Sequence, residues 1–446
     1  MASDILHIKD SYYFDVPKSF WRRDFESASQ INGSFPWFAR LDSDYQDWEA
    51  DRFIEKLKGI VDDPSVLVGL KEQWEQAKHS HANHGKPLDQ FLVDSAADLE
   101  SRASVWRSKY EPTAKSALDA YVAKFPEEKF AWVAMLLRDK GKKAQWEQFS
   151  KEADSKEAFS EYLALDRSKW DSHKLASYSD ALSGKVFIPQ VFGGQLRNAY
   201  DRESGICISK YMIIELAVAL LVFFAFRWLA GKMRNGEAPK GKLWNLLEGA
   251  VQFVRNQVVV PAMGDDHSAD RFLPLFLTIF FFILGCNLAG MIPFLGAPTA
   301  SFSTTLVLAG VVFATSLIFG IKELGAVGFF ANMAPQIDLP FGLGKLISLV
   351  VLAIETFSLL IKHLILAVRL LANMVAGHLV LLAIMGIAFG LHAASMNFGT
   401  WSLVAVISIL GTTALSFLEL FVCFLQAYVF TFLAALFIGS AIHHHH

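Results

Sequence analysis

Residues 345–394 read KLISLVVLAIETFSLLIKHLILAVRLLANMVAGHLVLLAIMGIAFGLHAA. This stretch contains no proline, and its apolar residues recur at helical spacing almost without interruption. As one α-helix it would be about 75 Å long, more than twice the length that an upright membrane span requires. A second long apolar segment, residues 401–442, follows the turn Asn397-Phe398-Gly399. Ordinary length mismatch is absorbed by modest tilt, so this pair predicts either a hairpin strongly tilted toward the membrane plane, which we favour, or one broken into steps.

Polar residues inside the first long segment occur at spacings that place them on shared faces. Glu355, Lys362 and Arg369 are seven residues apart, so each is rotated by only about 20° from the previous one on a helix. Asn373 extends this stripe. His378 lies nine residues beyond Arg369, which places it on the opposite side of the same helix.

The second long segment also carries a polar face. Thr412, Glu419 and Gln426 repeat at intervals of seven, with Ser416 and Cys423 beside them. Structural roles are open for several polar residues of the two segments: lysine can reach toward the interface, hydroxyls can bond to their own helix, and amides can join helices. Those residues are Lys362, His363, Thr412, Ser416 and Gln426.

Charged side chains at membrane depth cost a few kcal/mol each, so they normally face a partner or water and mark an ion route. Arg369 cannot lose its proton at physiological pH, whereas histidine and carboxylate groups can exchange theirs. This difference predicts a division of roles. Arg369 is a fixed positive barrier, while His378 and Glu419 on one side and Glu355 on the other relay protons.

The remaining apolar segments complete a membrane domain at residues 207–442. Spans are predicted at residues 208–230, 272–294 and 304–321, giving about five in all. Residues 243–260 have the pattern of a helix lying on the membrane surface, and the Gly- and Pro-containing stretch 323–342 is also expected at an interface. Glu215, within the first span, has two readings: a functional carboxylate, or one that reaches the nearby interface, which we favour.

Residues 1–206 predict an extramembrane helical domain. Helices are expected at residues 44–60, 65–78, 88–109, 114–125 and 157–165. Lysine and arginine dominate the loop after the first span, which places that loop in the cytoplasm. The helical domain then lies on the outer, periplasmic side. His79, His81 and His84 lack a fixed helical register and precede glycine and proline, so a solvated loop is preferred to a metal site.

Composition excludes several classes of protein. The chain has 446 residues, of which 53% are hydrophobic and 19% charged, with a net charge of −3. No basic stripe with interleaved aromatics appears, so nucleic acid is not an expected partner. The three cysteines lie in or beside apolar segments, so no disulfide framework is expected, and no cleavable signal peptide is recognised. No cofactor or metal is predicted, and no function is drawn from the histidine tail, residues 443–446.

Several motifs together resemble a known family. Residues 367–378, AVRLLANMVAGH, resemble the signature helix of the a subunit of F-type ATP synthases, and residues 419–430 resemble its partner helix. Residues 287–293, NLAGMIP, are similar to its early-span motif, and residues 7–14, HIKDSYYF, to the segment that opens bacterial members. The resemblance covers about residues 207–442. The long insertion before the first span departs from the family pattern.

The resemblance implies a mechanism and partners. Arg369 matches the essential arginine that faces the rotating c ring and keeps two half-channels separate. His378 and Glu419 would belong to the outer half-channel, Glu355 to the inner one, and Gln426 would hydrogen-bond near the arginine. Subunit b and the other synthase subunits are the further partners implied. The chain would be a non-catalytic channel subunit, since no Walker-type phosphate loop occurs.

The competing hypotheses are a free-standing proton-coupled transporter and a membrane scaffold whose front domain is the active module. The two long segments are not repeats of each other, unlike the halves of many transporters, and a scaffold gives Arg369 no role. A bacterial cytoplasmic (inner) membrane is the expected location, with the mitochondrial inner membrane as the alternative. The ion is expected to be the proton rather than sodium, because His378 titrates.

Overall fold

A computed structural model of the chain describes most of its residues and groups them into two compact units. The described residues are 10–31, 39–40, 42–80, 83, 85–153, 156–165, 170–233, 241–292, 294–325, 328–329, 343–389 and 397–442. The N-terminal unit is Val16–Ile208, and the membrane unit comprises the described residues of Met1–Asp15 and Ser209–His446. Predicted features at His81, His84 and residues 443–446 lie outside the described residues, as does most of the predicted stretch 323–342.

The N-terminal unit is mainly helical. Its elements are η1 (Ala28–Gln30), α2 (Ser43–Leu57), η2 (Pro64–Leu67), α3 (Leu70–Lys78), α4 (Leu88–Tyr110), α5 (Ala117–Lys124), α6 (Ala131–Arg138), α7 (Lys140–Ala153), α8 (Lys156–Leu163), α9 (Ser172–Leu182), β2 (Lys185–Phe187), β3 (Gln195–Leu196) and β4 (Arg202–Ser204). Strands β3 and β4 pair antiparallel. The expected helices are all present, with η2 and α3 dividing the one predicted at 65–78. Helices α6, α7 and α9 occupy stretches for which no element was predicted.

Local signals explain where these helices begin. The Asp42 carboxylate accepts a hydrogen bond from the Asp44 amide at the start of α2, and Asp63 caps η2 in the same way through Ser65. Such caps satisfy backbone donors that have no partner within the helix. The apolar faces then pack around two buried indoles, Trp74 of α3 and Trp146 of α7. This core accounts for a folded unit of helices too short to be stable alone.

The membrane unit contains the long apolar helices. Its elements are β1 (Tyr13–Asp15), α10 (Lys210–Met233), α11 (Lys242–Phe253), the π-helix η4 (Val254–Val259), α12 (Val260–Met263), α13 (Asp266–Gly290), η5 (Pro298–Ala300), α14 (Phe302–Leu324), α16 (Leu343–Phe389) and α17 (Phe398–Ile442). Five of the described helices, α10, α13, α14, α16 and α17, are long and apolar enough to cross a membrane. The prediction of an all-α polytopic membrane protein with about five membrane helices is therefore confirmed.

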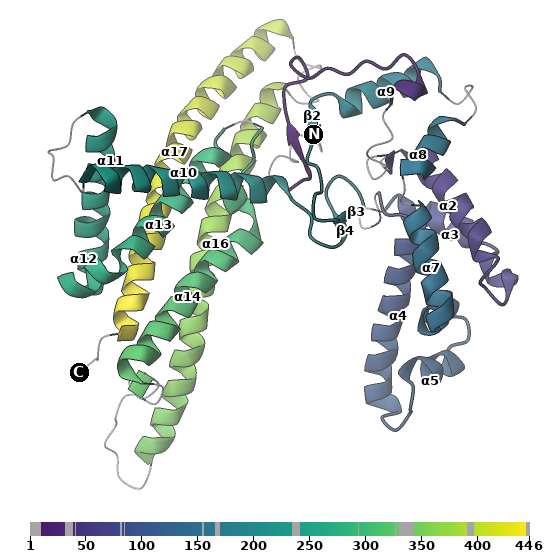
Figure 1. The fold of residues 1–446 in the computed structure, drawn as a ribbon, viewed down its shortest axis with the longest axis horizontal. Helices are drawn as coiled ribbons and strands as arrows, with labels where there is room; N and C mark the ends of the chain where they lie inside the picture. Colours follow the sequence, from purple (N-terminus) through teal and green to yellow (C-terminus); the bar gives the residue numbers. More distant parts are fainter. Residues whose placement is uncertain are drawn as a thin grey trace. The chain divides into compact units, whose positions relative to one another are not determined.

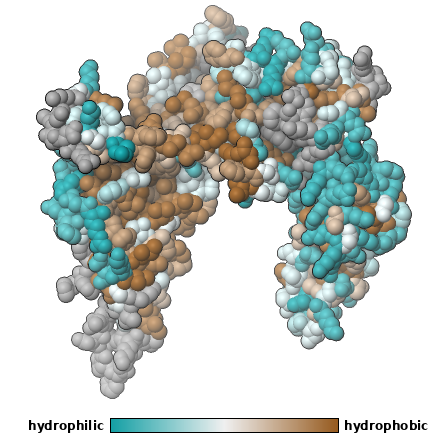
Figure 2. Space-filling view, in the orientation of Figure 1, coloured by the Kyte–Doolittle hydropathy of each residue, from teal (hydrophilic) through white to brown (hydrophobic). Residues whose placement is uncertain are grey.

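The surface of the membrane unit indicates what surrounds its helices. Figure 2 shows hydrophobic side chains spread over the exposed face of the long helices, whereas the N-terminal unit is largely hydrophilic. On α17, for example, Phe417 and Phe421 are 69% and 64% exposed. Apolar patches of this extent are not tolerated in water on an ordinary monomer. They match a chain whose helices are surrounded by lipid or by another membrane subunit.

The interior of the membrane unit is formed where α13, α14, α16 and α17 pack together with η4. Glycine allows close approach at these crossings. A Cβ on Gly439 of α17 would lie 3.1 Å from the Ala262 carbonyl oxygen, and one on Gly290 of α13 would lie 2.3 Å from the Met374 Cε atom of α16. Small residues have this role between membrane helices because van der Waals contact, not water exclusion, holds them together.

The two longest helices lie side by side and have the predicted hairpin order. Helix α16 has 47 residues and α17 has 45, so each is about 70 Å long. They contact each other along their lengths, and Figure 1 shows α10 crossing their direction. With its 24 residues, α10 has the length of an upright span. The tilt of the two long helices relative to the membrane stays a prediction.

The predicted surface helix at 243–260 is divided into α11, η4 and α12. One side of this segment, including Val254, Val258 and Val259, is buried against the bundle. The opposite side presents Arg255, whose Nε atom lies 2.6 Å from an Asp270 carboxylate oxygen. This two-sided character is what the amphipathic pattern predicted; its position at a membrane surface stays a prediction.

Candidate functional site

The predicted polar stripe of α16 contains one ion pair and one arginine that lacks an ionic partner. Lys362 Nζ lies 2.8 Å from Glu355 Oε1, and both side chains are about two-fifths exposed. Arg369 is half-buried, and its Nε and Nη2 atoms have no hydrogen-bond partner among the described residues. Asn373 is exposed. Buried donors normally find a protein or water partner, so the Arg369 guanidinium is available for a group on another molecule.

Two titratable side chains from different helices meet in the interior of the membrane unit. His378 Nδ1 of α16 lies 3.2 Å from Glu419 Oε1 of α17, and the two side chains are only 7% and 8% exposed. The backbone permits this contact because residue 377 is glycine: a Cβ there would lie 2.8 Å from Glu419 Oε1. The sequence placed both residues on one proton route, and the structure brings them together. A buried imidazole and carboxyl at this distance can exchange a proton.

The remaining polar residues of α17 divide between structural and open roles. Thr412 and Ser416 donate hydrogen bonds to carbonyl groups one turn earlier in their own helix, Ser408 and Thr412, at 2.8 and 2.9 Å. Thr412 and Ser416 therefore have the structural role that the sequence left open, a hydrogen bond to their own helix. Gln426 is buried, but no hydrogen bond joins it to Arg369 among the described residues. The role of Gln426 near the arginine, which the resemblance implied, stays a prediction.

His363, the other histidine of α16, has a structural environment. It is 3% exposed, and its Nδ1 atom lies 2.8 Å from the Leu359 carbonyl oxygen of the preceding turn. Its ring lies between Phe313 of α14 and Phe437 of α17. Packing between aromatic rings explains this histidine without a role in proton transfer.

Two further interhelical hydrogen bonds of the membrane unit were not predicted as site features. Asn287 of α13 is 1% exposed, and its Nδ2 atom donates a 3.4 Å hydrogen bond to the Cys423 carbonyl oxygen of α17. Glu215 of α10 accepts a 2.7 Å hydrogen bond from Thr304 of α14. The sequence singled out Asn287 and Glu215, but periodicity along one helix does not reveal a partner on another.

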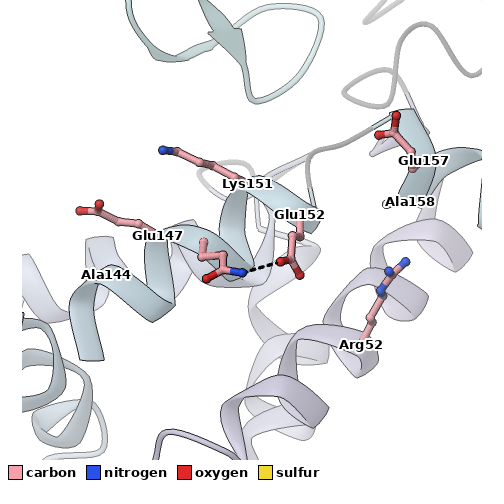
Figure 3. A pocket seen from close by; sticks show the side chains of 8 residues that line it. Arg52, Ala144, Glu147, Lys151, Glu152, Glu157 and Ala158 are labelled. Atoms are coloured by element: carbon pink, nitrogen blue, oxygen red, sulfur yellow. Dashed lines mark hydrogen bonds between the residues drawn. The ribbon is translucent and has the colours of Figure 1, made fainter. Parts of the chain in front are cut away.

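A surface hollow in the N-terminal unit was also considered as a site. It measures about 650 Å³ and lies between α2, α7 and α8 (Figure 3). Two of the charged groups around it form ion pairs: Arg52 with Glu161 at 2.5 Å and Glu152 with Lys56 at 2.5 Å. Surface charges of both signs at an open hollow are typical of a solvated face and do not by themselves indicate a catalytic site. Within the described residues, no group of three His, Cys, Asp or Glu side chains could hold a metal ion.

Comparison with known proteins assigns the membrane unit. The family described as ATP synthase A chain matches residues 212–439, a range that includes Arg369, His378 and Glu419. The chain belongs to the ATP synthase A chain family. As a member of this family, the chain carries Arg369 and the buried His378 and Glu419 pair within the matched region. The family match begins after residue 211, so the N-terminal unit lies outside it.

Three relatives illustrate the extent of the similarity to the ATP synthase A chain family. The chain is 40% identical over 234 residues to the ATP synthase subunit a of Anaeromyxobacter sp. (strain Fw109-5), covering 52% of this chain and 53% of that relative. It is 37% identical over 280 residues to the subunit of Chloroherpeton thalassium, covering 61% and 78%. Over 258 residues it is 33% identical to that of Myxococcus xanthus, covering 57% and 80%. The chain thus spans about half the length of the Anaeromyxobacter relative.

Proposed function

We propose that this chain is the proton-translocating stator subunit a of an F-type ATP synthase and has no catalytic reaction of its own. The observation that carries the proposal is the state of Arg369. It is a permanent cation on the longest apolar helix, half-buried, with two donor atoms that no described residue satisfies. A cation at membrane depth is retained only where it interacts with a partner or an ion route.

The partner that fits Arg369 is a carboxylate on each subunit of a rotating c ring. Beside the guanidinium such a carboxylate ionises, because a nearby opposite charge lowers its pKa; in apolar surroundings away from Arg369 it takes up a proton. Each elementary charge moved through the membrane potential yields about 2.3 kcal/mol per 100 mV. Proton flow past a fixed cation therefore drives the ring, and the cation prevents direct flow between two inlets.

The two proposed inlets differ in their surroundings. His378 and Glu419, 3.2 Å apart and buried, are assigned to the outer half-channel. Glu355, paired with Lys362 on the more exposed part of α16, is assigned to the inner one, with Asn373 and Gln426 near the arginine.

The location and further partners follow from this assignment. The named relatives are ATP synthase subunits a of bacteria, which supports a multi-pass protein of the bacterial cytoplasmic membrane. The partners are the c ring, subunit b of the stator, the other synthase subunits and membrane lipid. The N-terminal unit would lie on the periplasmic side, opposite the basic loop that follows α10. There its roles would be to brace the outer surface, to mediate dimerisation of the complex or to contact another stator component.

Replacement of Arg369 tests the proposal. In inverted membrane vesicles, Arg369→Ala is expected to abolish ATP-driven proton pumping while the subunit remains in the membrane. Arg227→Ala on α10 is the matched control, because it removes an arginine near a helix end and should pump normally. Normal pumping by Arg369→Ala would overturn the assignment. A free-standing transporter would instead move protons without a c ring or catalytic head copurifying in mild detergent.

A further inference from the structure

Glu215 lies in the first membrane helix, α10, and its carboxylate is bonded to another helix, α14. It is five residues beyond Lys210, where α10 begins, which corresponds to a depth of roughly 7–8 Å along the helix. Its Oε1 atom accepts a 2.7 Å hydrogen bond from Thr304 Oγ1 of α14, and the side chain is half-buried. The sequence interpretation of Glu215 as a carboxylate near the interface did not include this contact with α14.

A second acid lies at the start of the same helix. The Asp10 Oδ1 atom accepts a hydrogen bond from the Tyr211 amide at 3.2 Å, and the Lys210 amide donates to the Ser11 carbonyl at 2.8 Å, so the N-terminal segment caps α10. Burial raises the pKa of the Asp10 carboxyl, even though hydrogen bonds from Ser209, Tyr211 and Ser11 and the charge of Lys210 act in the opposite direction. Asp10 also interacts electrostatically with Glu215.

From Glu215, buried polar groups continue toward the His378 and Glu419 pair. The Cys286 side chain is buried on α13, and α13 packs against α10. The next residue, Asn287, is bonded through Nδ2 to the Cys423 carbonyl, one helical turn after Glu419. The Asn287 Oδ1 atom is buried and has no partner among the described residues. Buried oxygen atoms of this kind are usually satisfied by ordered water.

The connection η5 supplies another such atom at the junction of these helices. It contacts α10, α13, α14 and α16. Its Thr299 is fully buried, and no described residue satisfies the Oγ1 atom. The neighbouring Ala297 packs on Gly290, which also meets Met374, one turn before His378 on α16. Unsatisfied oxygens thus lie on elements that connect the start of α10 with the buried histidine.

We propose that Glu215 is a proton-relay residue of the outer inlet, taking protons from the side of Asp10 and passing them along water held by Thr304, Thr299 and Asn287 to His378 and Glu419. In each transfer the Glu215 carboxylate gains one proton from water on the side of Asp10 and releases one proton to the water that leads to His378 and Glu419. No other bond changes. The inference rests on the proposed function and extends it to a residue outside the two long helices.

A purely structural role for Glu215 would be to join α10 to α14 through Thr304. Glu215→Gln separates the two roles, because the amide oxygen can still accept from Thr304 but the side chain no longer exchanges a proton at the working pH. Glu215→Asp keeps a titratable carboxyl. Glu248→Gln is the matched control: Glu248 is a half-buried carboxylate on α11 that accepts a hydrogen bond from Gln252, away from the route.

The experiment measures ATP-driven proton pumping and its pH dependence in inverted vesicles that contain the assembled complex. We expect Glu215→Gln to slow pumping by at least about tenfold, since a proton-transfer group of this kind contributes about 10² or more, and to flatten the pH profile. Glu215→Asp should recover most of the rate, and Glu248→Gln should match the unaltered chain. Subunit content is measured by immunoblot in every preparation.

Two results would overturn the relay. One is pumping by Glu215→Gln with an unchanged rate and pH profile. The other is a loss that only follows a lowered amount of subunit in the membrane, which would assign Glu215 to helix packing. Arg369→Ala, prepared alongside, separates failure of the relay from failure of the proposed function. If Arg369→Ala does not pump and Glu215→Gln pumps normally, only the relay is refuted. If Arg369→Ala pumps, the proposed function is refuted.

Discussion

The contact between α16 and α17 at residue 377 allows a sharp test of the buried pair. In Gly377→Ala, the new Cβ would lie 2.8 Å from Glu419 Oε1 and 3.2 Å from its Cδ. These distances are shorter than van der Waals contact, so the Glu419 carboxylate must move from its position 3.2 Å from His378. Overpacking of this kind costs about 1–3 kcal/mol. If that cost falls on the proton-transfer step, the rate decreases by roughly 5- to 150-fold.

Gly386→Ala is the matched control on the same helix, because a Cβ at Gly386 would meet nothing within 4 Å. Both substitutions gain about 1 kcal/mol of helix propensity, so a difference between them reports the contact with Glu419. Initial rates of ATP-driven acidification are compared in inverted vesicles at equal subunit content. Equal rates for the two variants would show that the spacing of His378 and Glu419 does not limit transport.

Three further predictions concern other parts of the chain. Replacing His378 or Glu419 with leucine should slow transport and change its pH dependence, measured by pumping at a series of outer pH values; an unchanged profile argues against a relay through the pair. Arg40 and Glu49 form a bidentate pair that is 2% and 5% exposed, so Arg40→Met should destabilise the N-terminal unit by about 3–5 kcal/mol. The loss of stability is measured as a lower temperature at which protease begins to cleave the N-terminal unit of the intact chain. Replacing both Arg40 and Glu49 with apolar residues should recover much of the lost stability. Deletion of residues 40–190 should leave pumping in place; complete loss would assign the N-terminal unit a part in coupling.

Much of the fold was predictable because each helix carries its own signal. Length and apolar composition identified five spans, and the absence of proline from residues 345–394 predicted one continuous helix, observed from Leu343 to Phe389. Arg369 stood out since a guanidinium among apolar residues has few structural explanations. Helices α6, α7 and α9 lie outside the predicted ranges, and the tertiary core that includes Val133 of α6 and Trp146 of α7 stabilises the first two beyond their local propensity.

The arrangement of the candidate site depended on contacts that sequence spacing does not encode. Periodicity placed Arg369 and His378 on opposite sides of one helix, but it could not specify which residue of α17 faces His378. Gly377 decides that, since only a residue without a side chain lets the Glu419 carboxylate approach this closely. Glu215 and Thr304 are 89 residues apart in the chain, and their pairing depends on the tertiary fold that brings the start of α10 to the start of α14.

The sequence by itself determined that this is a multi-span helical membrane protein, which faces of its long helices are polar, and where a permanent cation lies among apolar residues, because these properties follow from composition and the 3.6-residue repeat. Only the tertiary structure decided that residues 10–15 pack with the membrane unit, that His378 meets Glu419, and that Glu215 bonds to α14. The physical reason is that a helix fixes the direction of its own side chains, whereas the partner each one meets depends on the register in which small residues let neighbouring helices come together.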